Sequence, residues 1–256
     1  MMHLRNLTLK MFLIAFLFSS TSIASASTAI DTTVTEDLPI LTENDMALVL
    51  LVIMEKAQKT KETSEGEQKY SWIKGQFHAA LNQADIEPAR KKIIFKSIPN
   101  LVKAIEAAYF HKAPTDPTFA QIEVTVPEHI TTYAELQEYV IAYELPRFNQ
   151  TFRESLINQD IAPLVYALFA VANQVATLTD EEKMNFQIVL ANAVIADAFD
   201  TSSSQSGDTA ALTLISTDQS TLTAMVPSSA EALIRSYANE VTLAPQSSSF
   251  CSCFGE

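Results

Sequence analysis

The chain has 256 residues, 48% of them hydrophobic, and its 30 acidic and 17 basic side chains give a formal net charge of −13. A chain of this length and apolar content can form a substantial core, which excludes a disordered protein, and its acidity predicts repulsion from nucleic acid. The four glycines, at positions 66, 75, 207 and 255, fit neither a phosphate-binding loop nor a nucleophile elbow, so nucleotide enzymes and α/β-hydrolases are disfavoured and no cofactor is expected.

The first 26 residues have the three-part pattern of a secretory signal peptide. Basic side chains among the first ten residues precede the apolar run from Met11 to Phe18, and small residues with an A-x-A site follow it. The run is too short to span a bilayer, so we expect cleavage after Ala26 and no stable membrane insertion of the mature chain. The alternative is an uncleaved anchor or a buried first helix. The pattern predicts a secreted or periplasmic protein, and removal of the peptide gives a net charge of −15.

The mature chain is expected to begin with an extended lead-in over residues 27 to 41, which are rich in Thr and Asp. Residues 42 to 112 then form an N-terminal helical subdomain. Its first helix begins at Thr42, because Thr42 and Asp45 have the spacing of a capping box, in which side chains bond the free backbone N–H groups of the first turn.

Three further helices are predicted in this subdomain from the period of their apolar residues. The second covers residues 67 to 83, the third begins near Pro88, and Pro99 separates it from the fourth. Residues 55 to 112 are locally basic, with 11 Lys and Arg against 7 Asp and Glu. Such a run is typical of a solvated helix face, and the alternative is a docking patch for anionic lipid or an acidic partner.

Residues 113 to 130 are predicted to connect two subdomains. Prolines interrupt the helical pattern there, and the alternation of apolar and polar residues from Ile122 to Val126 predicts a small β element near residues 120 to 126. The charge changes at the same place, since residues 113 to 256 hold 4 basic and 18 acidic side chains. Both observations favour a division of the fold in this segment.

Residues 131 to 241 are predicted to form a C-terminal acidic helical subdomain. Pro146 ends or redirects its first helix, and a nearly all-apolar helix that begins at Pro163 is expected at the centre of the fold. Three of its helices are expected to begin with capping-box pairs. These pairs are Thr132 with Glu135, Thr179 with Glu182, and Ser228 with Glu231.

The end of the chain is less regular. Residues 201 to 226 start as a Ser-rich loop, and their Thr-rich part at 210 to 226 predicts either a hairpin about Asp218 or two short helices. Residues 242 to 256 form a flexible Ser/Cys tail. The sequence thus predicts a mostly α, multi-helix globular domain of about seven to eight helices, with at most small β elements near residues 120 to 126 and 210 to 226.

No metal site is expected, because the mature histidines His78, His111 and His129 are not paired at helical spacing. The sulfurs of Cys251 and Cys253 lie in the predicted tail, without surrounding charges that would activate them. They are interpreted as thiols without a catalytic role. A strained bridge between them and a disulfide to a second chain, which would make a homo-oligomer, are the alternatives.

One short segment resembles an enzyme family. Glu154-Ser155-Leu156-Ile157-Asn158 resembles the E-S-x-x-N segment of lytic transglycosylases, in which that glutamate is the general acid. The resemblance covers five residues, and the Gly-Leu-Met-Gln stretch that follows in the family is missing here. It implies glycan cleavage with Glu154 as the acid, whereas a carboxylate on a solvated helix surface is the other interpretation.

Aromatic residues gather around Pro146 and are candidates for a groove that receives a peptide or a glycan. Their spacing also fits packing in the core. The candidates are Tyr139, Tyr143, Phe148 and Phe152, with Tyr133 beside them.

Our preferred hypothesis from the sequence is an exported helical binding or effector-like protein. It would act by surface recognition of a protein partner or cell-surface component outside the cytoplasm, without an active site of a common type. The alternatives are a secreted hydrolase that uses Glu154 and an assembly subunit of the cell envelope. A buried, concave setting for Glu154 would favour the hydrolase.

Overall fold

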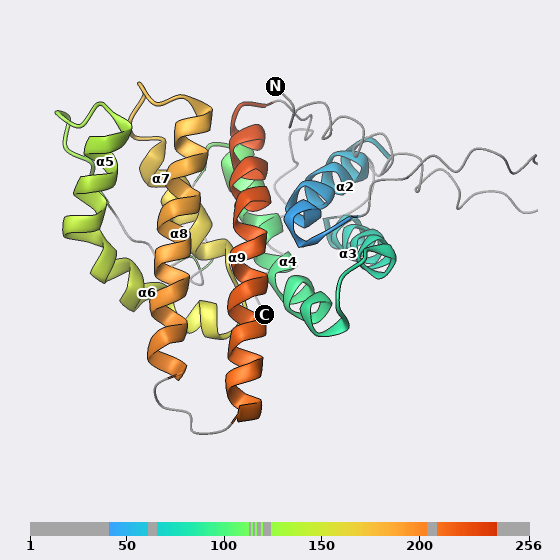
Figure 1. Ribbon diagram of the computed structural model, residues 1–256. Helices are drawn as coiled ribbons and strands as arrows, with labels where there is room; N and C mark the ends of the chain where they lie inside the picture. Colours follow the sequence, from blue (N-terminus) through green and yellow to red (C-terminus); the bar gives the residue numbers. More distant parts are fainter. Residues whose placement is uncertain are drawn as a thin grey trace, which may run out of the picture.

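The computed structural model describes residues 41–60, 66–112, 124–203 and 209–239, together with residues 114, 116 and 119. The predicted signal peptide, the lead-in up to residue 40 and the Ser/Cys tail lie outside these residues. Every regular element of the described chain is helical, which confirms the mostly α fold (Figure 1). The elements are η2 Glu43–Asp45, α2 Met46–Thr60, α3 Gly66–Gln83, α4 Pro88–Tyr109, α5 Tyr133–Tyr139, η3 Val140–Glu144, α6 Leu145–Ile157, α7 Ala162–Ala172, α8 Asp180–Ser203 and α9 Thr209–Tyr237.

Helices begin at capping boxes at three of the predicted places. Each threonine N–H donates to the acidic side chain three residues on, which satisfies a backbone group that the helix itself leaves free. The distances are 2.9 Å from Thr42 to Asp45, 3.0 Å from Thr132 to Glu135 and 2.8 Å from Thr179 to Glu182.

The long helix α9 corrects the prediction for residues 210 to 226 and for Ser228. The Thr-rich stretch forms neither a hairpin nor two short helices, and Ser228 lies inside α9 with its hydroxyl donated to the Met225 carbonyl. Packing explains the difference, because Leu222 and Val226 are fully buried and α9 lies against α2, α4 and α8. The apolar area buried on this face outweighs the weak helix propensity of threonine.

Helix α4 corrects the predicted break at Pro99, which lies within one continuous helix. A proline removes one backbone hydrogen bond inside a helix, but apolar residues on both sides of Pro99 are buried in the same core. Ile94 and Ile105 have no exposed surface, and Ile98 has 1%. Burial along the whole length of α4 therefore keeps the two halves in one helix.

The predicted β element near residues 120 to 126 is wrong for its described part, since Val124 to Val126 form no strand. Val124 is nevertheless buried, with 5% exposure, as expected for an apolar position of an alternating segment. The side-chain amide of Gln174 pairs with this backbone in place of a second strand, donating to the Val124 carbonyl at 2.7 Å and accepting from Val126 N–H at 3.0 Å.

One hydrophobic cluster contains buried residues from α2, α3 and α4 and from α5 to α9. Helix α9 is central to it, with α8 on one side and α4 on another (Figure 1). This core does not by itself mark a boundary at residues 113 to 130, and the division into two subdomains stays a prediction. Within the described ranges, no helix has both the length and the apolar character needed to cross a bilayer.

Candidate functional site

The segment η3 joins α5 to α6 as one wide helical turn. Leu145 N–H donates to the carbonyl of Val140, five residues back, which is the π-helical pattern. Pro146 follows directly and has no N–H, so it cannot continue the regular α-helical bonds of α5. Pro146 stands in the first turn of α6, and helical turns continue from Tyr133 to Ile157, so the chain does not leave the helical conformation at Pro146.

The wide turn exposes two large apolar side chains that stand two positions apart in the sequence. Tyr143 is 73% exposed and Ile141 46%, whereas Val140 is fully buried and anchors the turn in the core. Glu138 and Ala142 are exposed one turn away at helical spacing. We name Glu138, Ile141, Ala142 and Tyr143 the Tyr143 surface.

Neighbouring side chains hold the Tyr143 surface in place. The ring of Tyr139 lies 5.5 Å from the ring of Tyr143, and the Tyr139 hydroxyl donates to the Thr125 carbonyl at 3.4 Å. Glu135 adds negative charge nearby, because hydrogen bonds from the Thr131 backbone, and then from Thr132, hold the pKa of its exposed carboxyl below its usual value. The surface is thus aromatic, acidic and fixed to the scaffold.

The other two candidate groove aromatics do not reach this surface. Phe148 is fully buried and Phe152 is 1% exposed, and their rings stack 5.7 Å apart in the core between α6 and its neighbours. The four candidates therefore do not line one groove. Tyr143 is exposed and Tyr139 is half-buried beside it, whereas Phe148 and Phe152 are buried and stabilise the helix that carries them.

Glu154 lies on the exposed side of α6, in its last turn. The buried, concave setting that would favour the hydrolase alternative is absent at Glu154.

Two of the three histidines in the described chain make ring contacts. His111 has a φ of 53° just after α4, and its ring stacks 4.1 Å from that of Tyr237 on α9. His78 meets Phe95 edge-on at 5.3 Å, and His129 is exposed. No three His, Cys, Asp or Glu residues of the described chain are placed to hold a metal ion. Cys251 and Cys253 lie outside the described residues.

A polar cluster around Asp160 was not predicted from the sequence. Asp160 follows α6, and its carboxylate accepts from Asn100 of α4 at 2.5 Å and from Ala162 N–H at 3.1 Å. Lys103, one turn after Asn100, pairs with Asp116. Burial raises the pKa of the Asp160 carboxyl, and the hydrogen bond from Asn100 opposes this rise only in part.

Gln159 extends this cluster to α9. It has a φ of 66°, a conformation that usually favours glycine, and its carbonyl accepts from the Ser97 hydroxyl at 2.8 Å. Its side-chain amide donates to Asp218 at 2.8 Å. The partners stand about 60 positions apart in the chain, so no local motif announces the cluster. Its contacts join α4, α9 and the turn between α6 and α7. We therefore interpret the cluster as one that stabilises the fold.

Asp160→Asn is expected to be at least as stable as the wild type at pH 7, with an advantage that shrinks as the pH falls toward about 4. Because the folded pKa of Asp160 is raised, the folded state binds its proton first and gains stability as the pH falls through that window. The asparagine oxygen still accepts from Ala162 N–H, and the Asn100 amide can turn so that its oxygen accepts from the new Nδ2. Asparagine does not titrate. Urea unfolding of both proteins at the two pH values measures the difference.

Asp160→Ala is the control, since it removes both hydrogen bonds and should destabilise by about 1–3 kcal/mol. An asparagine variant that is less stable than the wild type at pH 7, or a difference that does not vary with pH, would contradict the expectation.

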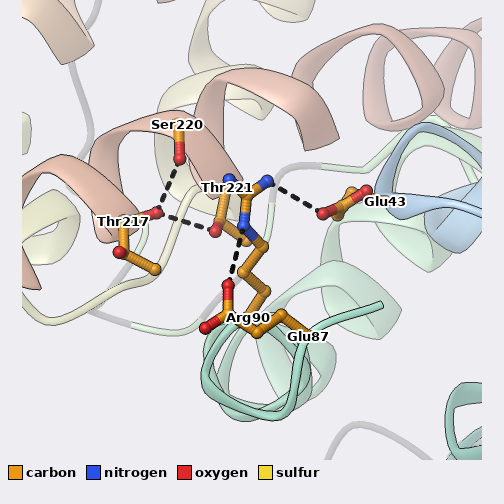
Figure 2. A network of polar contacts seen from close by, with 6 residues as sticks. All are labelled: Glu43, Glu87, Arg90, Thr217, Ser220 and Thr221. Atoms are coloured by element: carbon orange, nitrogen blue, oxygen red, sulfur yellow. Dashed lines mark hydrogen bonds and ion pairs between the residues drawn. The ribbon is translucent and has the colours of Figure 1, made fainter. Parts of the chain in front are cut away.

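A second polar network fixes η2 to α4 beside α9. Arg90 donates to Glu43 at 2.9 Å and lies 3.9 Å from Glu87 (Figure 2). Within α9, the Thr217 carbonyl accepts hydrogen bonds from the hydroxyls of Ser220 and Thr221 (Figure 2). The Arg90 pairs join the first turns of η2 and α4, whereas the hydroxyl bonds lie within α9, and these six residues offer no nucleophile with an adjacent base.

The chain matches no protein-family model, and comparisons with curated proteins and with solved structures gave no match.

Proposed function

We propose that the protein is exported and acts outside the cytoplasm by recognising another protein surface through the Tyr143 surface, without catalysis. One observation carries this proposal. Tyr143 is 73% exposed on a turn that also exposes Ile141 and is held by the buried Val140. Large aromatic side chains on rigid supports are the usual anchors of protein interfaces, because they bury much area and lose little conformational entropy on binding.

The geometry of η3 supports the same proposal. Wide π-type turns inside helices recur at functional sites, and here the turn directs Tyr143 outward. A structural role would favour burial of the ring, as occurs for Phe148 a few residues later. The Tyr143 ring instead keeps 73% of its surface exposed while it lies against the Tyr139 ring.

The signal-peptide pattern of residues 1 to 26 supports the location. An exported protein meets its partners at a cell surface or in an extracellular space, without nucleotide cofactors. The absence of a glycine-rich phosphate loop and the acidity of the mature chain agree with such a role.

Photo-cross-linking in the producing cells tests this function with a matched pair of positions. Ile141 and Ile157 are both isoleucines with 46% exposure, and only Ile141 belongs to the Tyr143 surface. Each is replaced in turn by p-benzoylphenylalanine, and the adducts of the exported protein are identified by mass spectrometry. We expect a defined adduct from position 141 and none from position 157.

Tyr143→Ala in the position-141 probe should reduce the adduct about tenfold, because truncation of an interface anchor typically weakens binding by that factor or more. An absence of adducts at position 141, or the same adducts at both positions, would refute recognition through this surface.

A further inference from the structure

A basic face lies on α3 and the first half of α4. Lys74, Lys92 and Lys96 are exposed there, with Lys92 and Lys96 one turn apart on α4. The half-buried ring of Phe95 lies among them, 5.4 Å from the Lys74 ammonium and edge-on to His78. We name Lys74, His78, Lys92, Phe95 and Lys96 the Lys92 face.

The Lys92 face and the Tyr143 surface lie on opposite sides of the molecule. Figure 1 shows α3 at the right and α5 at the left, with α8 and α9 between them. One copy therefore cannot bring its two surfaces together, whereas two copies can. This arrangement agrees with the uneven charge of the chain, whose residues 55 to 112 are basic and whose later residues are strongly acidic.

We propose that the Tyr143 surface of one copy binds the Lys92 face of the next, so that the protein assembles head to tail. This rests on the proposed function and names a second copy of the chain as the partner. The two surfaces are chemically complementary, because Glu138 supplies the negative charge that the lysines attract. The Tyr143 ring also offers a face on which an ammonium group is favoured.

The contact joins two different surfaces of the protein. In an open chain of copies, one end therefore keeps a free Tyr143 surface and the other end keeps a free Lys92 face. Such a heterologous contact gives rings or open chains of subunits, unlike a symmetric dimer. The apolar part is small, since Ile141 and Tyr143 are its large apolar side chains, and charges contribute strongly to the contact. We expect weak association that appears on the order of 0.1–1 mM protein and is reduced by salt.

Sedimentation velocity of the full chain tests the proposal with two charge reversals. Glu138→Lys disables the Tyr143 surface, and Lys92→Glu disables the Lys92 face. Glu154→Lys is the matched control, because it makes the same charge change on an exposed glutamate. Glu154 lies about four helical turns after Glu138 along the continuous segment of α5, η3 and α6. At that separation a charge is largely screened from the Tyr143 surface.

We expect the wild type and Glu154→Lys to associate at low salt, and each reversal to weaken association by about fivefold or more. The decisive sample is the equimolar mixture of Glu138→Lys with Lys92→Glu. The first variant keeps a competent Lys92 face and the second a competent Tyr143 surface, so the mixture should form dimers that grow no further.

Three results would overturn head-to-tail assembly. These are a wild type that stays monomeric up to about 1 mM, a Glu138→Lys variant that associates as well as Glu154→Lys, and a mixture that stays monomeric. A monomeric wild type that still gives an adduct with a different protein from position 141 would remove this proposal and leave the proposed function intact.

Discussion

Replacing Phe148 by alanine is expected to lower the free energy of unfolding by about 3–5 kcal/mol. The ring is fully buried and stacks on Phe152, so its removal leaves a cavity that the packed helices around it can fill only in part. Tyr143→Ala, five residues earlier, is expected to change stability by no more than about 0.5 kcal/mol, because that ring is 73% exposed.

Urea unfolding followed by circular dichroism measures both variants under one set of conditions. The contrast separates the two interpretations of the aromatic residues around Pro146, since a shared groove would give both positions modest and similar effects. A loss below about 1 kcal/mol for Phe148→Ala would contradict its place in the core, and a loss above about 2 kcal/mol for Tyr143→Ala would assign that ring to the fold.

Replacing Phe16 by aspartate is expected to abolish export almost completely. The residue stands in the apolar run from Met11 to Phe18, where a signal peptide must enter the membrane during translocation. An aspartate at the centre of an inserting segment is disfavoured by about 3 kcal/mol relative to phenylalanine, and this run has few apolar residues to offset it.

Fractionation of cells that produce the variant measures the effect. We expect the full-length chain in the cytosol, with the leader uncleaved. Val34→Asp is the control, because it makes the same kind of change in the predicted lead-in after the cleavage site and should be exported normally. Equal export of the two variants would show that the apolar run does not direct the chain.

Local sequence patterns predicted the helical class and three helix starts, because those features depend on neighbouring residues. A capping box needs only a threonine and an acidic residue three positions later, as at Thr179 and Glu182. Tyr143 was among the candidate groove residues, because the aromatic cluster and Pro146 are both visible in the sequence.

The errors arose where distant parts of the chain decide the structure. Ser228 has the local pattern of a helix start, yet α9 continues through it because Leu222 and Val226 are fully buried and α9 packs against α4 and α8. The Asp160 cluster joins residues about 60 positions apart, and so a periodic or motif-based interpretation cannot find it. Phe148 and Tyr143 are both aromatic, so their residue types alone do not distinguish them. Tyr143 lies in the wide turn η3 and is exposed, whereas Phe148 lies after it and is buried.

The compartment is the claim on which the proposed role depends, and the mass of the intact protein tests it most directly. Protein is recovered separately from the cytosol and from the periplasm or medium of producing cells, and its amino terminus is assigned by mass spectrometry. We predict that the exported fraction holds nearly all of the protein and that its chain begins at Ser27. A cytosolic protein that retains residues 1 to 26 would contradict export and, with it, recognition outside the cytoplasm.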